Sequence, residues 1–195
     1  MSIRMLALAA VVLAGLAVAG CQGGPESPKA QTFTSQAEGY SITYPGDWRQ
    51  FKGGPTSDFS AIPLDQTDLS GVFDNLLVHT EMLKDPLTLD EYFGIKTAVM
   101  AKVPEELEFK ELERGQATIG GMPAKKIVYT LKMDDTPVTS VAYFVVSGSR
   151  GYTVLATIAT ARFAARKAAL DEMVNSLKLE GVAATAPTAP TAPAK

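Results

Sequence analysis

The chain has 195 residues, of which 46% are hydrophobic, and its formal net charge is −3. That length is enough for one domain with a hydrophobic core, and the mild acidity argues against nucleic-acid binding, which depends on clustered basic side chains. The sequence contains one cysteine, so no disulfide within the chain is expected and the fold must rest on its core.

Residues 1–20 have the pattern of a secretory signal peptide. Arg4 gives the start a positive charge, an uncharged apolar run follows, and small residues come directly before Cys21. The run covers residues 6–19, too few for a spanning helix, which needs about 20 apolar residues. The sequence Val18-Ala19-Gly20-Cys21 resembles the lipobox of exported bacterial lipoproteins. The alternative is an ordinary cleaved signal peptide that happens to have a cysteine nearby.

This resemblance implies that Cys21 is the site of lipid attachment. In bacterial lipoproteins the cysteine thiol is alkylated by diacylglycerol, the chain is cut before the cysteine, and the new amine is usually acylated. Each buried CH₂ contributes about 0.8 kcal/mol, so two or three acyl chains hold a protein firmly. Cleavage removes Arg4, which leaves 17 basic and 21 acidic residues and a net charge of −4. We therefore expect the acyl chains, and no polybasic patch, to attach the protein to the membrane.

The residue after the cysteine bears on location. It is Gln22, whereas an Asp at this position commonly retains lipoproteins in the inner membrane. We expect an exported, lipid-anchored protein that lies at the periplasmic face of the outer membrane if the bacterium is Gram-negative.

Two segments flank one expected domain. Residues 21–30 are rich in Gly, Ser and Pro and predict a tether. Residues 181–195 contain Thr-Ala-Pro repeats, which have no apolar face to bury and predict a disordered or polyproline II tail. That tail is either solvated chain or a spacer that reaches toward peptidoglycan. The folded domain is expected at residues 31–180.

The domain opens with a predicted strand and turn. Residues 40–44 alternate Tyr or Ile with Ser or Thr, which is typical of a half-buried strand. Pro45-Gly46-Asp47 predicts a turn, after which residues 48–51 are expected to return as the partner strand. Trp48 is expected to anchor the core or its rim, and a ligand-stacking role is the alternative.

Residues 52–74 are the least regular internal stretch, with a short strand expected at 59–62. A loop of this length is often functional, so it is a natural place to look for binding. Residues 75–82 predict a strand that is apolar on both faces near its start. The strand contains His79, which has no second His, Cys or carboxylate at ligand spacing. We expect a packed or surface histidine and no metal site.

A helix is predicted to begin after Thr88, with Glu91 completing a capping box, and Pro104 is expected to stop it. Leu87 and Tyr92 occupy the positions of a hydrophobic staple. The stripe of this helix that faces the core is expected to consist of Leu89, Tyr92, Phe93, Lys96, Val99 and Met100.

Four strands in a meander are predicted next. They are expected at residues 107–118, 122–132, 138–147 and 152–158, with Gly120-Gly121 and Asp134-Asp135 in the first two turns. The last two strands are apolar on both faces, so both faces of the sheet must be covered. A final amphipathic helix can cover one face and the helix after Thr88 the other. Its expected stripe is Phe163, Arg166, Leu170, Met173, Val174 and Leu177.

Three stretches of this sequence, together with a helix near Leu89-Tyr92 that lies between the first two, resemble PsbP-like domains, including the DcrB-type bacterial lipoproteins. The three stretches are the opening Gly39-Tyr40-Ser41-Ile42-Thr43-Tyr44-Pro45 with Trp48, the hairpin Gly120-Gly121-Met122-Pro123-Ala124, and the closing Val174-Asn175-Ser176-Leu177-Lys178. The resemblance extends from Phe33 to Leu179. It implies an α+β fold in which an antiparallel β-sheet is sandwiched between helices. Members are mostly non-enzymatic subunits or binding proteins, so no catalytic residue and no cofactor is carried over.

The sequence therefore favours a lipid-anchored accessory or binding protein that docks an envelope protein or a small ligand. One alternative is an envelope hydrolase with carboxylates converging from distant strands, and another is a structural spacer. Acid pairs occur at Asp90-Glu91, Glu105-Glu106 and Asp134-Asp135. Adjacent residues on a helix or strand point apart, and the first and last pairs are explained by capping and turn chemistry. We find no nucleophile elbow or phosphate loop in the sequence.

Overall fold

The computed structural model describes residues 28–51, 57–69, 71–100 and 102–180. The expected signal peptide, the lipid-attachment residue Cys21, most of the tether and the Thr-Ala-Pro tail lie outside the described residues. The predictions made for them therefore stay predictions.

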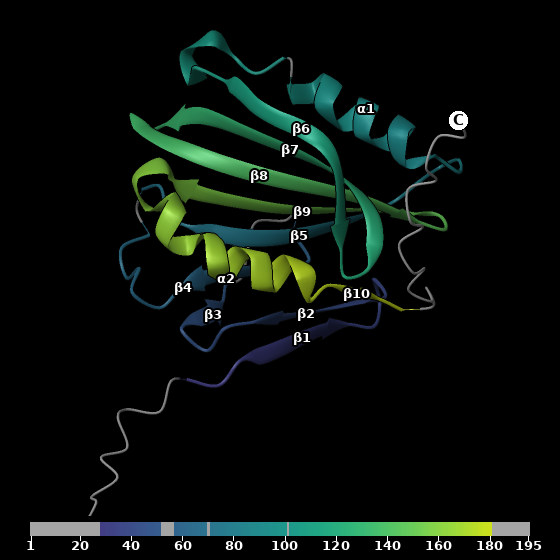
Figure 1. Cartoon of the computed structure of the whole chain (residues 1–195), viewed down its shortest axis with the longest axis horizontal. Helices are drawn as coiled ribbons and strands as arrows, with labels where there is room; N and C mark the ends of the chain where they lie inside the picture. The colour runs from purple at the N-terminus through teal and green to yellow at the C-terminus, as the bar shows by residue number, and fades with distance from the viewer. Residues whose placement is uncertain (1–27, 52–56, 70, 101, 181–195) are drawn as a thin grey trace, which may run out of the picture.

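The described residues form a mixed α+β structure with two antiparallel sheets (Figure 1). The strands are β1 (Gln31–Ser35), β2 (Tyr40–Tyr44), β3 (Trp48–Gln50), β4 (Phe59–Pro63), β5 (Asn75–Met82), β6 (Lys110–Ile119), β7 (Met122–Met133), β8 (Thr136–Ser147), β9 (Arg150–Ala159) and β10 (Lys178–Leu179). The α-helices are α1 (Leu89–Met100) and α2 (Phe163–Asn175), and the short 3-10 helices are Glu105–Leu107 and Thr160–Arg162.

The large sheet has seven strands in the order β3-β4-β5-β9-β8-β7-β6. The predicted meander is confirmed, because β6 to β9 pair with their sequence neighbours in antiparallel register. The turn between β7 and β8 uses Asp134 and Asp135, whose φ angles of 45° and 62° are those of a type I′ hairpin turn. The short strand expected within the irregular stretch is β4. It lies between β5 and the edge strand β3 in the large sheet.

The small sheet corrects one expectation. Residues 40–44 form β2, but its partners are β1 and the distant β10, and not the strand that follows the turn. That next strand, β3, pairs with β4 in the large sheet. The turn itself forms, with the Trp48 N–H donating to the Pro45 carbonyl over 3.0 Å, but it carries the chain from one sheet to the other.

The small sheet and α2 cover one face of the large sheet, and together they enclose the main core. The side chain of Trp48 is 1% exposed in this core, so its expected role as an anchor is confirmed. The hairpin between β6 and β7 closes against the end of α2. At Gly120, where φ is +55°, an added Cβ would lie 1.7 Å from the Leu177 carbonyl oxygen, so no larger residue fits there.

The other face is covered by α1, whose Tyr92 and Phe93 pack edge-to-face against Phe144 of β8. The predicted capping box is present: Thr88 N–H donates to Glu91 Oε2 over 2.8 Å, and Glu91 N–H donates to Thr88 Oγ1 over 3.2 Å. The predicted stripe is wrong at Val99, which is 65% exposed. Val99 lies on the exposed side of the last turn, whereas Met100, where the helix ends, packs against the core under α1. Neither helix among the described residues is long and apolar enough to cross a membrane.

Candidate functional site

A pocket lies between α2 and strands β6 to β9 of the large sheet. Its floor is built from two neighbouring rows of paired residues on β6 to β9. One row runs from Ala156 through Val141 and Val128 to Glu113, each directly opposite the next. Because side chains alternate along a strand, the two rows that share this face lie two residues apart. The second row includes Tyr143 and, beside it, Lys126.

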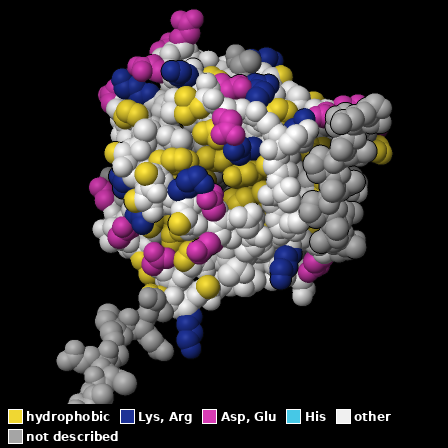
Figure 2. Space-filling model, in the orientation of Figure 1, with side chains coloured by type: hydrophobic (Ala, Val, Ile, Leu, Met, Phe, Trp, Pro, Cys, Tyr) yellow, Lys and Arg dark blue, Asp and Glu magenta, His cyan; other side chains and the backbone are white. Residues whose placement is uncertain are grey.

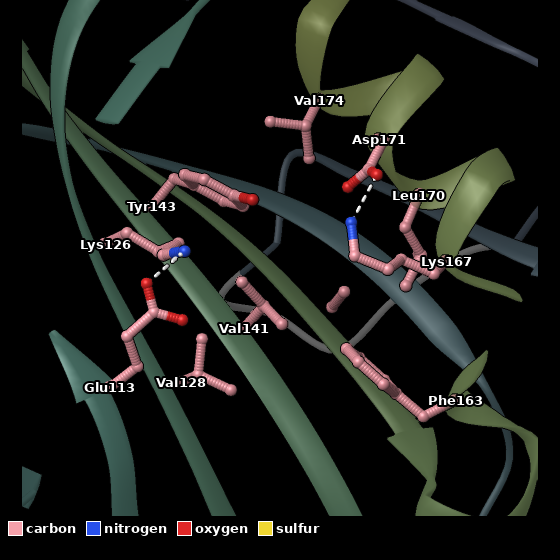
Figure 3. A pocket seen from close by; sticks show the side chains of 11 residues that line it. Glu113, Lys126, Val128, Val141, Tyr143, Phe163, Lys167, Leu170, Asp171 and Val174 are labelled. Atoms are coloured by element: carbon pink, nitrogen blue, oxygen red, sulfur yellow. Dashed lines mark hydrogen bonds and ion pairs between the residues drawn. The ribbon is translucent and has the colours of Figure 1, made fainter. Parts of the chain in front are cut away.

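The roof of the pocket is one face of α2. Its lining residues are Phe163, Lys167, Leu170, Asp171 and Val174, which follow helical spacing and so point the same way. Figure 3 shows the side chains from the sheet and from α2 facing one another across the pocket. Figure 2 shows hydrophobic side chains gathered at the centre of the same face of the molecule, with charged side chains around them. We call this pocket the α2 groove.

The charged residues at the α2 groove form two ion pairs. Lys126 Nζ lies 2.7 Å from Glu113 Oε1 on the sheet side, and Lys167 Nζ lies 2.5 Å from Asp171 Oδ2 on the helix side. Each pair joins one positive and one negative charge, so the rim carries no net charge. The apolar floor and the neutral rim therefore favour an uncharged, apolar guest.

Tyr143 places a phenol hydroxyl among these apolar side chains. Burial raises the pKa of Tyr143, so the hydroxyl stays protonated and can both donate and accept a hydrogen bond. The hydroxyl has no hydrogen-bond partner among the described residues. The space enclosed by the groove is about 150 Å³. The arrangement can hold a small apolar group and form a hydrogen bond with one polar atom of it.

A second cluster lies beyond the Phe163 end of α2 and fixes where that helix starts. Asp74, which is fully buried, accepts two hydrogen bonds of 2.8 Å from Arg162 and one of 3.0 Å from the Ala159 N–H. Arg166 donates to Asp74 over 3.4 Å and to both oxygens of Asp65 over 2.7 Å. We call these four charged residues the Asp74 cluster. Burial alone raises the pKa of Asp74, but the hydrogen bonds from Arg162 and Ala159 outweigh it and hold that pKa below its usual value.

A third polar cluster lies under α1. The Tyr92 hydroxyl donates to Glu81 over 2.7 Å, and Lys96 forms an ion pair with the same carboxylate. Hydrogen bonds from Lys96 and Tyr92 outweigh the effect of burial and lower the pKa of Glu81. The ionised carboxylate thus neutralises Lys96 and accepts a hydrogen bond from Tyr92, and these contacts tie α1 to β5.

His79 lies two residues before Glu81 on β5 and is half-buried. Its Nδ1 is buried and has no partner within the described part of the chain. The described residues contain no group of three or more His, Cys, Asp or Glu side chains placed to hold a metal ion.

The structure separates the acid pairs seen in the sequence. In the first pair, Glu91 caps α1 while Asp90 pairs with Lys125 on β7. The last pair forms the hairpin turn described above, and Glu105-Glu106 lies in an exposed 3-10 helix. None of these pairs reaches the α2 groove.

Sequence reasoning did not identify the α2 groove or the Asp74 cluster. The groove depends on the register of four strands, which no single segment reveals. The cluster did leave a signal: Arg166 stands within the otherwise apolar stripe predicted for α2, and a charged residue in such a stripe requires a buried partner.

Comparison with known proteins places the fold. Cyanobacterial PsbP (CyanoP) from Synechocystis sp. PCC 6803 is 19% identical and has a TM-score of 0.59, with 83% of this chain and 98% of that chain covered. LpqN, involved in cell envelope biogenesis of Mycobacterium tuberculosis, is 13% identical with a TM-score of 0.54, covering 77% and 91%. The Ran-binding protein Mog1p from Saccharomyces cerevisiae is 9% identical with a TM-score of 0.53, covering 78% and 96%.

These likenesses confirm the expected α+β fold, in which helices lie on both faces of an antiparallel sheet. No curated protein sequence matches the chain. A model of the PsbP family matches residues 28–179, which is most of the chain and almost all of its described part. The chain belongs to the PsbP family.

Proposed function

We propose that this protein is a lipid-anchored, non-catalytic binding protein of the cell envelope, which docks a partner protein or a small ligand in the α2 groove. The observation that carries the proposal is the groove itself: an apolar recess with a neutral, ion-paired rim. Concave apolar sites with a few polar groups are the usual form of a binding site. A spacer needs no such recess.

The envelope location rests on two independent supports. The sequence before Cys21 has the length, apolar content and small residues of a lipoprotein signal. LpqN, which shares the fold, is involved in cell envelope biogenesis in its own organism. Acyl chains on Cys21 would hold the domain within reach of the membrane through the 21–30 segment.

The absence of catalysis is supported by the electrostatics of the described residues. A hydrolase that uses carboxylates needs one with a raised pKa to act as an acid near neutral pH. Where the described carboxyl groups have a clearly shifted pKa, the shift is downward and caused by ion pairs or hydrogen bonds: Asp74, Glu81, Glu91 and Glu111. Such groups are stabilised as carboxylates, which suits structural pairing.

The anchor is tested by Cys21→Ser in the producing bacterium, with labelled palmitate and membrane fractionation as the measurements. We expect the variant to lose the label and either leave the membrane fraction or keep its signal peptide. Ser27→Ala, a substitution in the same segment, is the matched control and should stay labelled. Acylation that persists in the Cys21→Ser variant would contradict the lipid anchor.

The groove is tested by placing a photo-crosslinking amino acid at Val128, on its floor, in membranes that contain the full chain. The same amino acid at Ile95 is the control, because Ile95 is 53% exposed on α1, over the other face of the sheet. We expect a crosslinked species from position 128 that position 95 does not give. Identical patterns from the two positions would refute a binding role for the groove.

A further inference from the structure

We infer that the α2 groove binds a small, uncharged molecule that has one ring-sized apolar group and one hydrogen-bonding substituent, as in a phenol. This inference deepens the proposed function and rests on it, because it names the ligand class of the same groove. It follows from the volume of the groove, the neutrality of its rim and the placement of one hydroxyl.

The volume sets the size of the guest. The groove encloses about 150 Å³. The groove is open to solvent, but its volume is about that of an apolar protein cavity known to take up benzene. A longer chain or a fused ring system would have to project past the rim. The groove therefore matches a single six-membered ring.

The small residues that create this space lie in one cross-strand row. Ala156, Val141 and Val128 pair in sequence across β9, β8 and β7, so three small side chains lie side by side under α2. Leu170 and Val174 on the helix face them across the gap. Ala156 and Val141 are 3% and 8% exposed, so this part of the wall is shielded from bulk water. A guest that enters here replaces water against apolar walls, which is favourable in proportion to the area covered.

The rim argues for a neutral guest. Each lysine at the groove already has a carboxylate partner, Lys126 with Glu113 and Lys167 with Asp171. An anionic guest would have to compete with these carboxylates, and a cationic guest would have to compete with the lysines. In both cases the charge would also be moved toward apolar side chains, at a desolvation cost.

Tyr143 supplies the selective contact. Its ring stands in the floor beside Lys126, and Figure 3 shows its hydroxyl directed into the space between the sheet and α2. A ring bound against the valines can place one oxygen at this hydroxyl. A neutral hydrogen bond contributes about 0.5–1.5 kcal/mol, which corresponds to a roughly two- to tenfold change in affinity.

The test measures the binding of phenol, toluene and benzoate to the whole chain in phosphatidylcholine nanodiscs. Valine methyl NMR reports the groove through Val128, Val141 and Val174. Empty nanodiscs correct for partition of the probes into lipid. We expect phenol and toluene to shift these three methyl signals with saturation on the order of 1 mM. Benzoate, which has the same ring and a charge, is expected to bind at least tenfold more weakly.

Two variants separate specific from accidental binding. Val128→Phe fills the groove from its half-buried floor and should abolish the shifts at Val141 and Val174, whereas Val146→Phe, on the other face of β8, should not. Tyr143→Phe removes the hydroxyl and keeps the ring. It should lower the ratio of phenol to toluene affinity about two- to tenfold, and Tyr129→Phe on the opposite face should leave the ratio unchanged.

Several results would overturn the inference. They are the absence of saturable shifts with phenol and toluene, equal binding of benzoate, or an unchanged phenol-to-toluene ratio in Tyr143→Phe. Shifts of the same methyl signals that depend on protein concentration alone would assign the groove to a second copy of the chain. These outcomes leave the lipid anchor untouched, because palmitate labelling of Cys21 tests that separately. A crosslinked protein from position 128 without binding of the ring probes would retain the proposed function and reject this ligand class.

Discussion

Replacing the buried carboxylate of the Asp74 cluster should destabilise the fold strongly at neutral pH. Asp74→Asn keeps the size of the side chain and removes its charge. The substituted amide retains one oxygen that can accept, and it turns an NH₂ group toward Arg162 or toward the Ala159 N–H. At least one of the two 2.8 Å bonds from Arg162 or the 3.0 Å bond from Ala159 is therefore lost.

The magnitude follows from the burial of the two partners. Breaking a buried ion pair from one side costs about 3–5 kcal/mol, because a charge is left without its partner. The Arg162 side chain is 44% exposed, so water can solvate the guanidinium that Asp74 releases. We therefore expect a loss of about 2–3 kcal/mol in the free energy of unfolding. Asp65→Asn is the matched control: its side chain is 66% exposed, and the same substitution should cost less than about 1 kcal/mol.

The assay is urea unfolding followed by the fluorescence of Trp48, which is buried in the main core. Because the pKa of Asp74 is lowered in the folded state, its contribution is complete above the unfolded pKa of about 4 and is lost as the pH falls through the folded pKa. The gap between the wild type and Asp74→Asn should therefore be constant from pH 5 to 7 and narrow below pH 4. A gap under about 0.5 kcal/mol at pH 7, or one that widens on acidification, would refute the reasoning.

Two further predictions concern α1. Gly151→Ala should destabilise the protein by at least about 2 kcal/mol in urea unfolding, because the added Cβ would lie 2.5 Å from the Tyr92 ring. Gly94→Ala, by contrast, should stabilise the helix by about 0.5–1 kcal/mol, because its added Cβ meets no atom within 4 Å. If both substitutions have the same sign, the close packing of α1 on β9 is wrong. Thr88→Ala should lower the free energy of unfolding by about 1 kcal/mol in the same measurement, because the side chain that accepts a hydrogen bond from the Glu91 N–H is lost. Thr88→Ser keeps a hydroxyl and should retain most of that stability. Equal stability of the two variants would contradict the capping role.

Local signals in the sequence predicted the individual elements well. The capping residues of α1, the turns of the meander and the alternation in β2 each depend on a few adjacent residues, and all three are present in the structure. The partner of β2 could not be found in this way. Alternation determines which side chains of a strand face the core, but it carries no information about which other strand pairs with it. The partners of β2 include β10, which lies more than 130 residues further along the chain.

The buried stripes of both helices show what the sequence did contain and what it lacked. Each predicted stripe includes one basic residue, Lys96 in α1 and Arg166 in α2. In the structure each basic residue is bonded to a carboxylate on a distant segment, Glu81 and Asp74 respectively. A cation within a stripe that faces the core therefore predicts an anionic partner beside it: Glu81 is half-buried and Asp74 is fully buried. The position of that partner along the chain depends on the tertiary fold.

The two faces of the large sheet are filled differently, and the difference bears on function. Under α1, Tyr92 and Phe93 pack against Phe144, and the absence of a side chain at Gly151 lets the Tyr92 ring approach the sheet closely. Under α2, small residues from Ala156 to Val128 leave the groove. The groove is open to solvent, so a larger side chain on its floor would gain stability mainly by removing apolar surface from water, at about 25 cal/mol per Å².

One substitution on the half-buried floor, such as Val128→Phe, is enough to fill much of the space. The same sheet shows, on its α1 face, that aromatic side chains in this chain can fill such a gap. Open apolar volume that is easily filled and yet retained is typical of a site where activity is favoured over stability. Val128→Phe is therefore informative: a variant that is at least as stable as the wild type but binds no ring would separate the function of the groove from the stability of the fold.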